Sequence, residues 1–306
     1  MTGLDDAANA VTLRGVRLQR DRFQLGPLDC DIPRGMVTAI VGPNGSGKST
    51  LFRMLLGLEP VTRGEAAVLG TRLDLKNDGS FKARIGFLSE NPHAYENSFT
   101  ADEKARFASK WYPSWDWERY RKLLRHFDGD GNVKLSKLSK GMRRKVELSI
   151  AMAHDPELLL LDEPSSGLDP FAWKVMLEEL QRYMEAGDKT LILASHVTEE
   201  VRRLADYILF IYRGRILGLY EKDRLFDDWR VLAVQQQGSD GSGKLQQTPG
   251  LQGLSETGPG LFRLEVNEPE RAETYCRSCG FQVLGVQRME LEDILGCLIR
   301  KEEARR

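Results

Sequence analysis

The segment GPNGSGKST, residues 42–50, combines three glycines with a lysine and neighbouring hydroxyl side chains. It fits the pattern G-x-x-x-x-G-K-[ST]. Glycines let main-chain N–H groups converge on oxygen anions without Cβ clashes, and a following helix N-terminus adds a favourable dipole. We expect Lys48 to reach the β- and γ-phosphates of a nucleotide and Ser49 to ligate Mg²⁺. The expected phosphate-binding residues are Gly42, Pro43, Asn44, Gly45, Ser46, Gly47, Lys48, Ser49 and Thr50.

The segments on either side of this loop predict a strand followed by a helix. MVTAIV, residues 36–41, is rich in β-branched and apolar residues, as in a buried strand. The segment after the loop has apolar residues at helical spacing, with Leu51, Met54, Leu55 and Leu58 on one face. A strand-to-helix turn is the context that a phosphate loop needs. The alternative is a glycine-rich turn before an ordinary helix.

A second acidic motif lies at residues 157–164, ELLLLDEP. Its four leucines predict a buried parallel strand, and ligands bind at the carboxyl edge of such sheets. Asp162 is therefore expected to hold Mg²⁺, directly or through water. Glu163 is expected to face the γ-phosphate and to polarise the attacking water. The alternative is a pair of solvated acids at a strand end.

A helix is predicted from Gly141 to Ala153, with Val146 and Ile150 on its buried stripe. Ser139 then lies near the N-cap, where it either caps the helix or helps to form an anion site. The residues alone leave these two readings open. The run RRK at residues 143–145 is interpreted as a solvated helix face.

Two further segments carry polar residues that belong with these motifs. LILASH, residues 191–196, predicts another apolar strand that ends in His196. At the same carboxyl edge, this histidine could hydrogen-bond a γ-phosphate or the attacking water. SSGLDP, residues 165–170, predicts a tight turn that contains Asp169.

Composition excludes several classes of protein. The chain has 306 residues and a formal net charge of -1, which gives no support to non-specific nucleic-acid binding. No stretch of about 18 apolar residues predicts a membrane span, and MTGLDDAANA does not resemble a signal peptide. We therefore expect a cytosolic protein. The four cysteines are expected to be ordinary thiols, and Cys276 and Cys279 to be neighbours on a helix.

Taken together and in this order, the motifs resemble the ATP-binding cassette (ABC) family. They are Walker A at 42–50, LSKGM at 138–142, LLLLDE at 158–163, SGLD at 166–169 and His196. The resemblance covers residues 9–225, and LSKGM with WYPSWDWERY is similar to the ATPases of ABC-2-type exporters. It implies an α/β P-loop NTPase fold with an antiparallel β subdomain and a helical subdomain, here followed by a small α+β C-terminal appendage.

The resemblance also implies how the residues are used. Two chains would dimerise head to tail, with ATP and Mg²⁺ between the Walker A of one copy and the LSKGM of the other. Ser139 and Gly141 would then serve a phosphate bound by the partner copy. Glu163 corresponds to the catalytic base, His196 to the switch residue, and Asp169 to the residue that couples the two sites.

Four positions depart from the family pattern or rest on a weaker match. Glu90 stands where the family usually carries glutamine, and we expect it to contact Mg²⁺ and to alter the Mg²⁺ dependence. Lys140 replaces a glycine and is expected near the partner's phosphate or in solvent. Met142 replaces a glutamine. Phe23 is a candidate adenine-stacking aromatic, with a core phenylalanine as the equal alternative.

The chain divides into two predicted domains. Residues 1–228 form the ATP-binding domain, whose helical subdomain spans about 92–150. Residues 229–306 form the appendage. Its segment 236–260 is rich in Gly, Ser, Gln and Pro and predicts a flexible loop between paired strands.

The run WYPSWDWERY carries Trp111, Tyr112, Trp115 and Trp117. These aromatics are interpreted either as the core of the helical subdomain or as a docking surface for a membrane subunit.

The function predicted from these features is that of an ATP-hydrolysing subunit that energises an ABC-2-type exporter. Its partners would be integral membrane permease subunits and either a second copy or a related ATPase, with no nucleic acid. It would lie in the cytoplasm, peripheral on the inner face of the cell membrane. The alternative is a soluble ABC ATPase that acts on a non-membrane partner such as the ribosome. A P-loop kinase would not need LSKGM, SGLD and His196 together.

Overall fold

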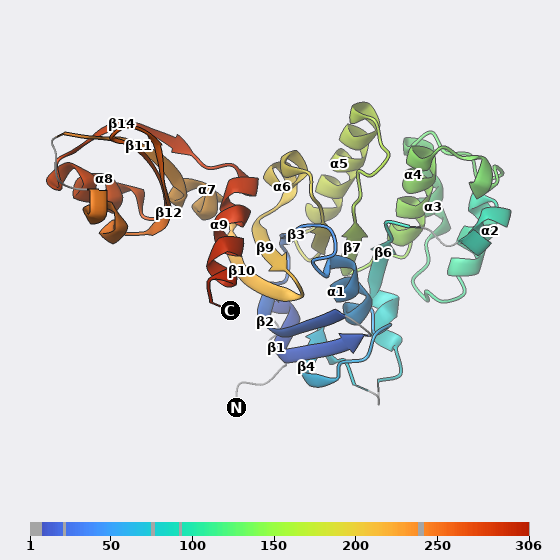
Figure 1. Cartoon of the computed structure of the whole chain (residues 1–306). Coiled ribbons are helices and arrows are strands. Elements are labelled where there is room, and N and C mark those ends of the chain that lie inside the picture. Colours follow the sequence, from blue (N-terminus) through green and yellow to red (C-terminus); the bar gives the residue numbers. More distant parts are fainter. Residues whose placement is uncertain (1–7, 21–22, 75–76, 92–93, 238–241, 306) are drawn as a thin grey trace. The chain divides into compact units, whose positions relative to one another are not determined.

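The computed structural model describes residues 8–20, 23–74, 77–91, 94–237 and 242–305 (Figure 1). Contacts divide the chain into two compact units, Met1–Leu219 and Tyr220–Arg306. The boundary expected at 228 lies inside the second unit, because helix α7 (Lys222–Asp228) groups with the residues that follow it.

The first unit contains a central six-stranded sheet in the order β10-β9-β3-β8-β7-β6. The strands β3, β6, β7, β8 and β9 run parallel, so their carboxyl ends share one edge. Every residue of β3, β7 and β8 is buried, as continuous apolar runs predict. The bounds are β3 Val37–Val41, β6 Ile85–Leu88, β7 Leu158–Asp162, β8 Thr190–Ala194, β9 Tyr207–Tyr212 and β10 Arg215–Glu221.

A smaller antiparallel sheet in the order β2-β1-β4-β5 completes the β structure of this unit. Strands β1 (Asn9–Arg20) and β2 (Phe23–Pro33) pair antiparallel, and β4 (Arg63–Val68) pairs with the other edge of β1 and with β5 (Thr71–Arg72). The antiparallel β subdomain expected from residues 9–35 is therefore present.

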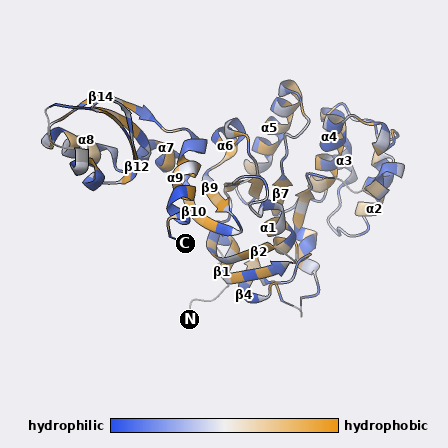
Figure 2. Ribbon diagram, in the orientation of Figure 1, coloured by the Kyte–Doolittle hydropathy of each residue, from blue (hydrophilic) through white to orange (hydrophobic). Residues whose placement is uncertain are grey.

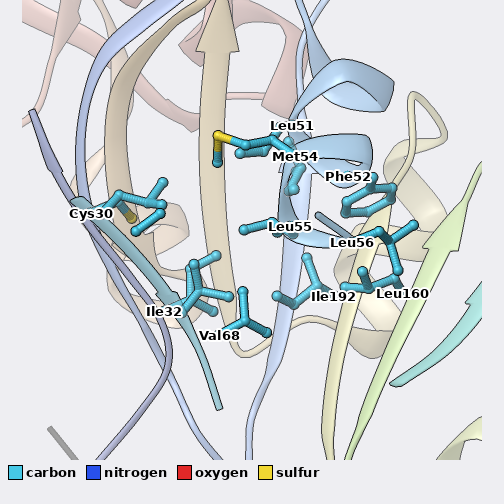
Figure 3. Close-up of a cluster of buried hydrophobic side chains, with 14 of the residues drawn as sticks. Cys30, Ile32, Leu51, Phe52, Met54, Leu55, Leu56, Val68, Leu160 and Ile192 are labelled. Carbon is cyan, nitrogen blue, oxygen red and sulfur yellow. The ribbon is translucent and has the colours of Figure 1, made fainter. Parts of the chain in front are cut away.

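Helix α1 (Lys48–Leu55) packs between the two sheets and anchors the phosphate loop (Figure 3). Its Leu51, Met54 and Leu55 are fully buried or nearly so, which confirms three members of the predicted face. The prediction for the fourth, Leu58, is wrong: this residue lies beyond the helix end and is 54% exposed. The helix ends at Leu55 because Leu56 and Gly57 turn the chain back toward the smaller sheet.

Within the described residues, the helical subdomain contains α2 (Ala101–Ala108), α3 (Trp117–His126) and α4 (Lys140–Met152). Each helix starts at a side-chain cap. Thr100 forms a capping box with Glu103, and Asp116 accepts from two N–H groups of α3. Further helices of this unit are α5 (Pro170–Met184) and α6 (Thr198–Leu204).

The aromatic run of the helical subdomain is split between two environments. Trp115 and Trp117 pack against its buried cluster, with ring centroids 5.5 Å apart. Trp111 is 68% exposed and contacts Phe107, whose ring is also half-exposed. The core interpretation therefore holds for Trp115 and Trp117, and the docking interpretation stays a prediction for the exposed Trp111.

His154 is a buried histidine that follows α4. It is 1% exposed, and its ring stacks on Tyr112 with centroids 3.8 Å apart. Its Nε2 lies 3.2 Å from the carbonyl oxygen of Ile85, and Nδ1 has no hydrogen-bond partner in the described part of the chain. Burial lowers the pKa of His154 to about 4, against the opposing effect of the Ile85 carbonyl.

This histidine makes folding stability dependent on pH. The folded pKa of about 4 lies below the usual value of about 6.5. Between these two pH values, His154 therefore binds more protons in the unfolded state than in the folded state. Its contribution is present above pH about 6.5 and is lost as pH falls toward about 4, to a total near 3 kcal/mol. We expect His154→Phe to flatten this part of the urea-midpoint profile.

The second unit has one antiparallel sheet in the order β12-β13-β11-β14. Strands β11 (Arg230–Gln236) and β13 (Leu261–Val266) pair antiparallel, as their segments predict. The unit also contains β12 (Leu251–Gly258), β14 (Phe281–Arg288), α8 (Pro269–Ser278) and α9 (Leu291–Glu303), besides α7. An α+β appendage is therefore present.

The prediction of a flexible loop over residues 236–260 is wrong for most of that segment. Residues Ser242–Gln247 form a short 3-10 helix, η4, and Leu251–Gly258 form strand β12, which pairs with β13. Leu251 and Leu254 pack against the core of this unit. Pairing with a neighbouring strand overrides the local composition. Residues 238–241 lie outside the described residues.

Hydropathy differs between the central sheet and the surface helices. In Figure 2, strand β9 is mostly orange, whereas helices α2 and α4 carry blue segments. None of the helices in the described ranges has the length and apolar character that crossing a membrane requires.

Candidate nucleotide site

A cavity of about 570 Å³ opens at the carboxyl edge of the central sheet. Strand order explains its composition, because β3, β8, β7 and β6 are consecutive in the sheet and each ends at this edge. Residues expected to act together are thus brought together from segments far apart in the chain. The cavity is lined by Phe23, Asn44, Gly45, Ser46, Gly47, Lys48, Ser49, Thr50, Glu90, Asp162, Glu163 and His196.

The phosphate loop has a backbone that only glycine adopts easily. Gly45 and Gly47 have φ values of 75° and 112°. A Cβ on Gly42 would lie 2.1 Å from the carbonyl oxygen of Ile211, so that glycine also permits a close backbone approach. The loop therefore exposes its N–H groups at the start of α1, where an anion is favoured.

Lys48 places a buried ammonium inside this loop. Its Nζ donates to the carbonyl oxygens of Gly42 at 2.8 Å and Pro43 at 3.4 Å. The same Nζ lies 4.0 Å from a carboxylate oxygen of Glu163. A positive charge therefore lies between the loop and the end of β7.

The residues at the end of β7 fit a Mg²⁺ ion. Asp162 is 4% exposed, and its Oδ1 has no hydrogen-bond partner in the described part of the chain. Burial raises the pKa of Asp162, a hydrogen bond with Ser49 opposes this, and the charges of Glu90 and Glu163 raise it further. Asp162, Glu163 and Glu90 line the same cavity, but among the described residues no three His, Cys, Asp or Glu side chains are placed to hold a metal ion by themselves. Since Mg²⁺ is usually held by one or two carboxylates and substrate phosphates, it needs no larger protein cage.

Glu163 and His196 form a direct pair in the cavity. His196 Nδ1 lies 2.7 Å from Glu163 Oε2, and the histidine side chain is 65% exposed whereas that of Glu163 is 8% exposed. Glu163 has φ 51°, a left-handed conformation that a non-glycine residue adopts at a cost. A carboxylate is thus held between an ammonium and an imidazole, next to the phosphate loop.

Five predicted site residues lie outside this cavity lining: Gly42 and Pro43, whose carbonyl oxygens accept from Lys48, and Ser139, Gly141 and Asp169. Ser139 caps α4, since its Oγ accepts from the N–H of Met142 at 3.1 Å. Asp169 caps α5 by accepting from Phe171 and Ala172, each at 2.9 Å. Within one chain, Ser139 therefore has the capping role, and a second role requires another copy.

The start of α4 packs directly on the SSGLDP turn. A Cβ on Gly141 would lie 2.9 Å from the carbonyl oxygen of Gly167, so this position needs glycine for contacts within the chain. Lys140 donates to Ser166 Oγ at 2.9 Å. Lys140 is exposed, as the solvent alternative predicts, and this hydrogen bond also ties its ammonium to the turn.

Phe23 is placed where either of the two predicted roles is possible, and adenine stacking stays a prediction. It lines the cavity and also packs against the core cluster of the first unit. A Cβ on Gly47 would lie 2.9 Å from its ring. The ring therefore touches the phosphate loop.

One residue near the site was missed by sequence reasoning. Arg144 belongs to the run RRK that was interpreted as a solvated face, yet it is 2% exposed. Its guanidinium contacts the main chain at the ends of β6 and β7. The available signal was helical spacing, because Arg144, Leu148 and Ala151 lie at i, i+4 and i+7 and all are buried.

Comparison with known proteins agrees with this geometry. The ABC transporter family profile matches residues 25–166. The lantibiotic transport ATP-binding protein SrtF of Streptococcus pyogenes is 34% identical over 208 residues, which cover 66% of this chain and 86% of SrtF. The ABC transporter ATP-binding protein NatA of Bacillus subtilis is 33% identical over 207 residues, covering 64% and 83% of the two chains.

A third relative and a solved structure extend the comparison. The Nod factor export ATP-binding protein I of Cupriavidus metallidurans is 31% identical over 221 residues, covering 70% of this chain and 72% of the relative. The solved ATP-binding subunit of an ABC transporter superposes with a TM-score of 0.64 at 26% identity, covering 71% of this chain and 92% of that subunit. Together with the P-loop fold, these matches confirm the resemblance read from the motifs: the chain belongs to the ABC transporter family, as one of its ATP-binding proteins.

Proposed function

We propose that this chain is the ATP-hydrolysing subunit that energises an ABC-2-type exporter. The observation that carries the proposal is the position of Glu163, buried between Lys48 and His196 in the cavity of the phosphate loop. In this mechanism Glu163 polarises the attacking water, and His196 orients the carboxylate relative to the γ-phosphate. The relatives are named for lantibiotic transport and Nod factor export.

Mg²⁺ is the proposed metal cofactor. Ser49 and Asp162 would hold it, with Glu90 at its outer side. The buried Oδ1 of Asp162 without a protein partner supports this assignment. The ion would supply charge neutralisation for the γ-phosphate, while Lys48 and the loop N–H groups orient the nucleotide.

The proposed assembly is a head-to-tail dimer, either of two copies or with a related ATPase. Ser139 and Gly141 lie outside the cavity of their own chain and at the start of α4, where N–H groups favour an anion. We assign them to the γ-phosphate held by the partner copy, and Asp169 to contact between the two sites.

The membrane partner is proposed to dock on the helical subdomain. A groove of about 310 Å³ there is bordered by Tyr95, Phe107 and Trp111, which are 68%, 53% and 68% exposed. The same lining holds an ion pair between Lys104 and Glu96 at 2.7 Å. Exposed aromatics around a groove are typical of binding surfaces. The chain would then lie in the cytoplasm, peripheral on the inner membrane face.

A pull-down in the native host tests the exporter proposal. The Glu163→Gln chain, which should retain ATP, would be purified from detergent-solubilised membranes in the presence of ATP. We expect a stoichiometric polytopic membrane protein, which is lost when Phe107→Ala and Trp111→Ala are added. Leu58→Ala, which changes an exposed apolar residue outside the groove, should retain it. Co-purification of ribosomal proteins instead, or of the soluble chain alone, would contradict the exporter proposal.

Glu90 is expected to set the Mg²⁺ requirement. Glu90 lines the same cavity as Asp162 and Ser49, so its charge lies near the residues proposed to hold the ion. Glu90→Gln removes one negative charge, so the Mg²⁺ concentration for half-maximal turnover should rise about threefold or more. Turnover measured against Mg²⁺ at fixed ATP checks this. The control is Glu256→Gln in the second unit, and an unchanged midpoint with unchanged turnover for Glu90→Gln refutes the idea.

A further inference from the structure

Arg144 joins the ends of two neighbouring strands through main-chain contacts alone. One terminal nitrogen donates to the carbonyl oxygens of Ser89 and, at 3.1 Å, of Glu90. The other donates to the carbonyl oxygens of Asp162, at 2.5 Å, and Glu163. These carbonyls follow β6 and β7, whose ends carry the acidic residues of the nucleotide cavity.

Burying the guanidinium of Arg144 carries a desolvation cost. Arg144 is 2% exposed, and burial lowers the pKa of its guanidinium, against the charges of Glu147, Asp162 and other carboxylates. Placing this cation in the interior is unfavourable unless its donors are used. A planar fork with five N–H donors can reach two strand ends at once, which a lysine ammonium cannot do with the same geometry.

Glu163, whose carbonyl oxygen accepts from Arg144, has a strained backbone conformation. At φ 51°, Glu163 is held in the left-handed region, which is unfavourable for a residue with a side chain. Its N–H donates to the carbonyl oxygen of Ala194 at 2.9 Å, and its own carbonyl oxygen accepts from Arg144. The residue is thus fixed on both sides, and this conformation directs its carboxylate to His196.

We propose that Arg144 is a positioning residue for hydrolysis, which holds the backbone of Glu163 in its strained conformation and ties it to the Glu90 segment. The inference rests on the proposed role of Glu163 in ATP hydrolysis. Because Arg144 lies on α4, the helix that Ser139 caps also determines the geometry of the carboxylate in its own chain. Without Arg144, the peptide after Glu163 relaxes and the carboxylate moves away from the attacking water.

Two substitutions in the full-length chain test this role. Arg144→Met keeps an unbranched side chain but removes all donors, and kcat should fall about 10- to 100-fold, as for a catalytic group displaced by about 1 Å. KM for ATP should stay within about twofold because the phosphate loop is untouched. Arg144→Lys should recover part of kcat, since an ammonium can reach one strand end. Arg143→Met is the matched control: Arg143 pairs with Glu147 at 3.0 Å on the same helix and should keep turnover.

A double-mutant cycle separates positioning from a general structural role. With Glu163→Gln already present, Arg144→Met or Arg144→Lys should lower the residual kcat by less than about twofold, because no catalytic carboxylate remains to be positioned. If the two losses multiply, or if kcat of both Arg144 variants equals that of the wild type, the inference fails. If Arg144→Met does not fold, Arg144→Lys decides in the same cycle. If Glu163→Gln itself keeps full turnover, the proposed role of Glu163 fails and the inference fails with it. If Glu163→Gln loses turnover but the Arg144 variants do not, only the inference about Arg144 is refuted.

Discussion

Glu163→Gln should lower kcat for ATP hydrolysis by at least about 100-fold while ATP affinity changes little. General-base catalysis by a positioned carboxylate contributes roughly 10²–10⁴-fold. Glutamine has nearly the same shape as glutamate but cannot accept the proton of the attacking water. Glu163 is 8% exposed and lies 2.7 Å from His196, so the charge acts in a site with little water. Phosphate release by the purified chain measures kcat, and nucleotide titration measures affinity.

The matched control for this prediction is Glu199→Gln. Glu199 is 60% exposed on α6, close in sequence to His196, and pairs with Arg203 at the surface. The turnover of Glu199→Gln should equal that of the wild type. Retention of normal turnover by Glu163→Gln would assign the base to another residue and remove the central step of the proposed function.

Lys48→Ala should weaken nucleotide binding by roughly 100-fold, since a hydrogen-bonded charge to phosphate is worth about 1.5–3 kcal/mol. The Lys48 ammonium is buried, which strengthens its attraction for phosphate oxygens. Its removal also leaves the carbonyl oxygens of Gly42 and Pro43 without this donor, so the loop loses its internal support. Equilibrium titration with ATP in the presence of Mg²⁺ measures the affinity.

Lys301→Ala on α9 controls for the loss of a positive charge in general. Its affinity for ATP should not change. The thermal midpoint of both variants without nucleotide shows whether the Lys48 effect arises from binding or from unfolding. Unchanged affinity in a folded Lys48→Ala chain would contradict the proposed contact with the β- and γ-phosphates.

Local patterns predicted the elements that carry the chemistry. The phosphate loop, the buried strand before it and helix α1 follow from glycine spacing and from apolar runs within about 20 residues. The same holds for β7 and β8. Their largely apolar sequences are typical of strands that are buried on both faces of a parallel sheet. The residues Asp162, Glu163 and His196 could then be placed at one edge, because parallel strands share a carboxyl end.

Contacts between distant segments could not be predicted in this way. The burial of Arg144 depends on how α4 packs against the ends of β6 and β7, and charge alone suggested solvent. Lys140 is held on Ser166 because Gly141 brings α4 against the turn. Strand β12 forms from a sequence of loop-like composition because β13 offers it a partner.

The sequence by itself therefore determined the inventory of reactive groups, the order of the motifs and the family. These depend on residue types at short spacing, which local steric and hydrogen-bonding preferences translate directly into structure. Only the tertiary structure decided which groups touch: that Glu163 lies between Lys48 and His196, and that Arg144 holds its backbone. The physical reason is that these contacts join segments more than about 15 residues apart, so their geometry is set by the packing of whole elements rather than by any local preference.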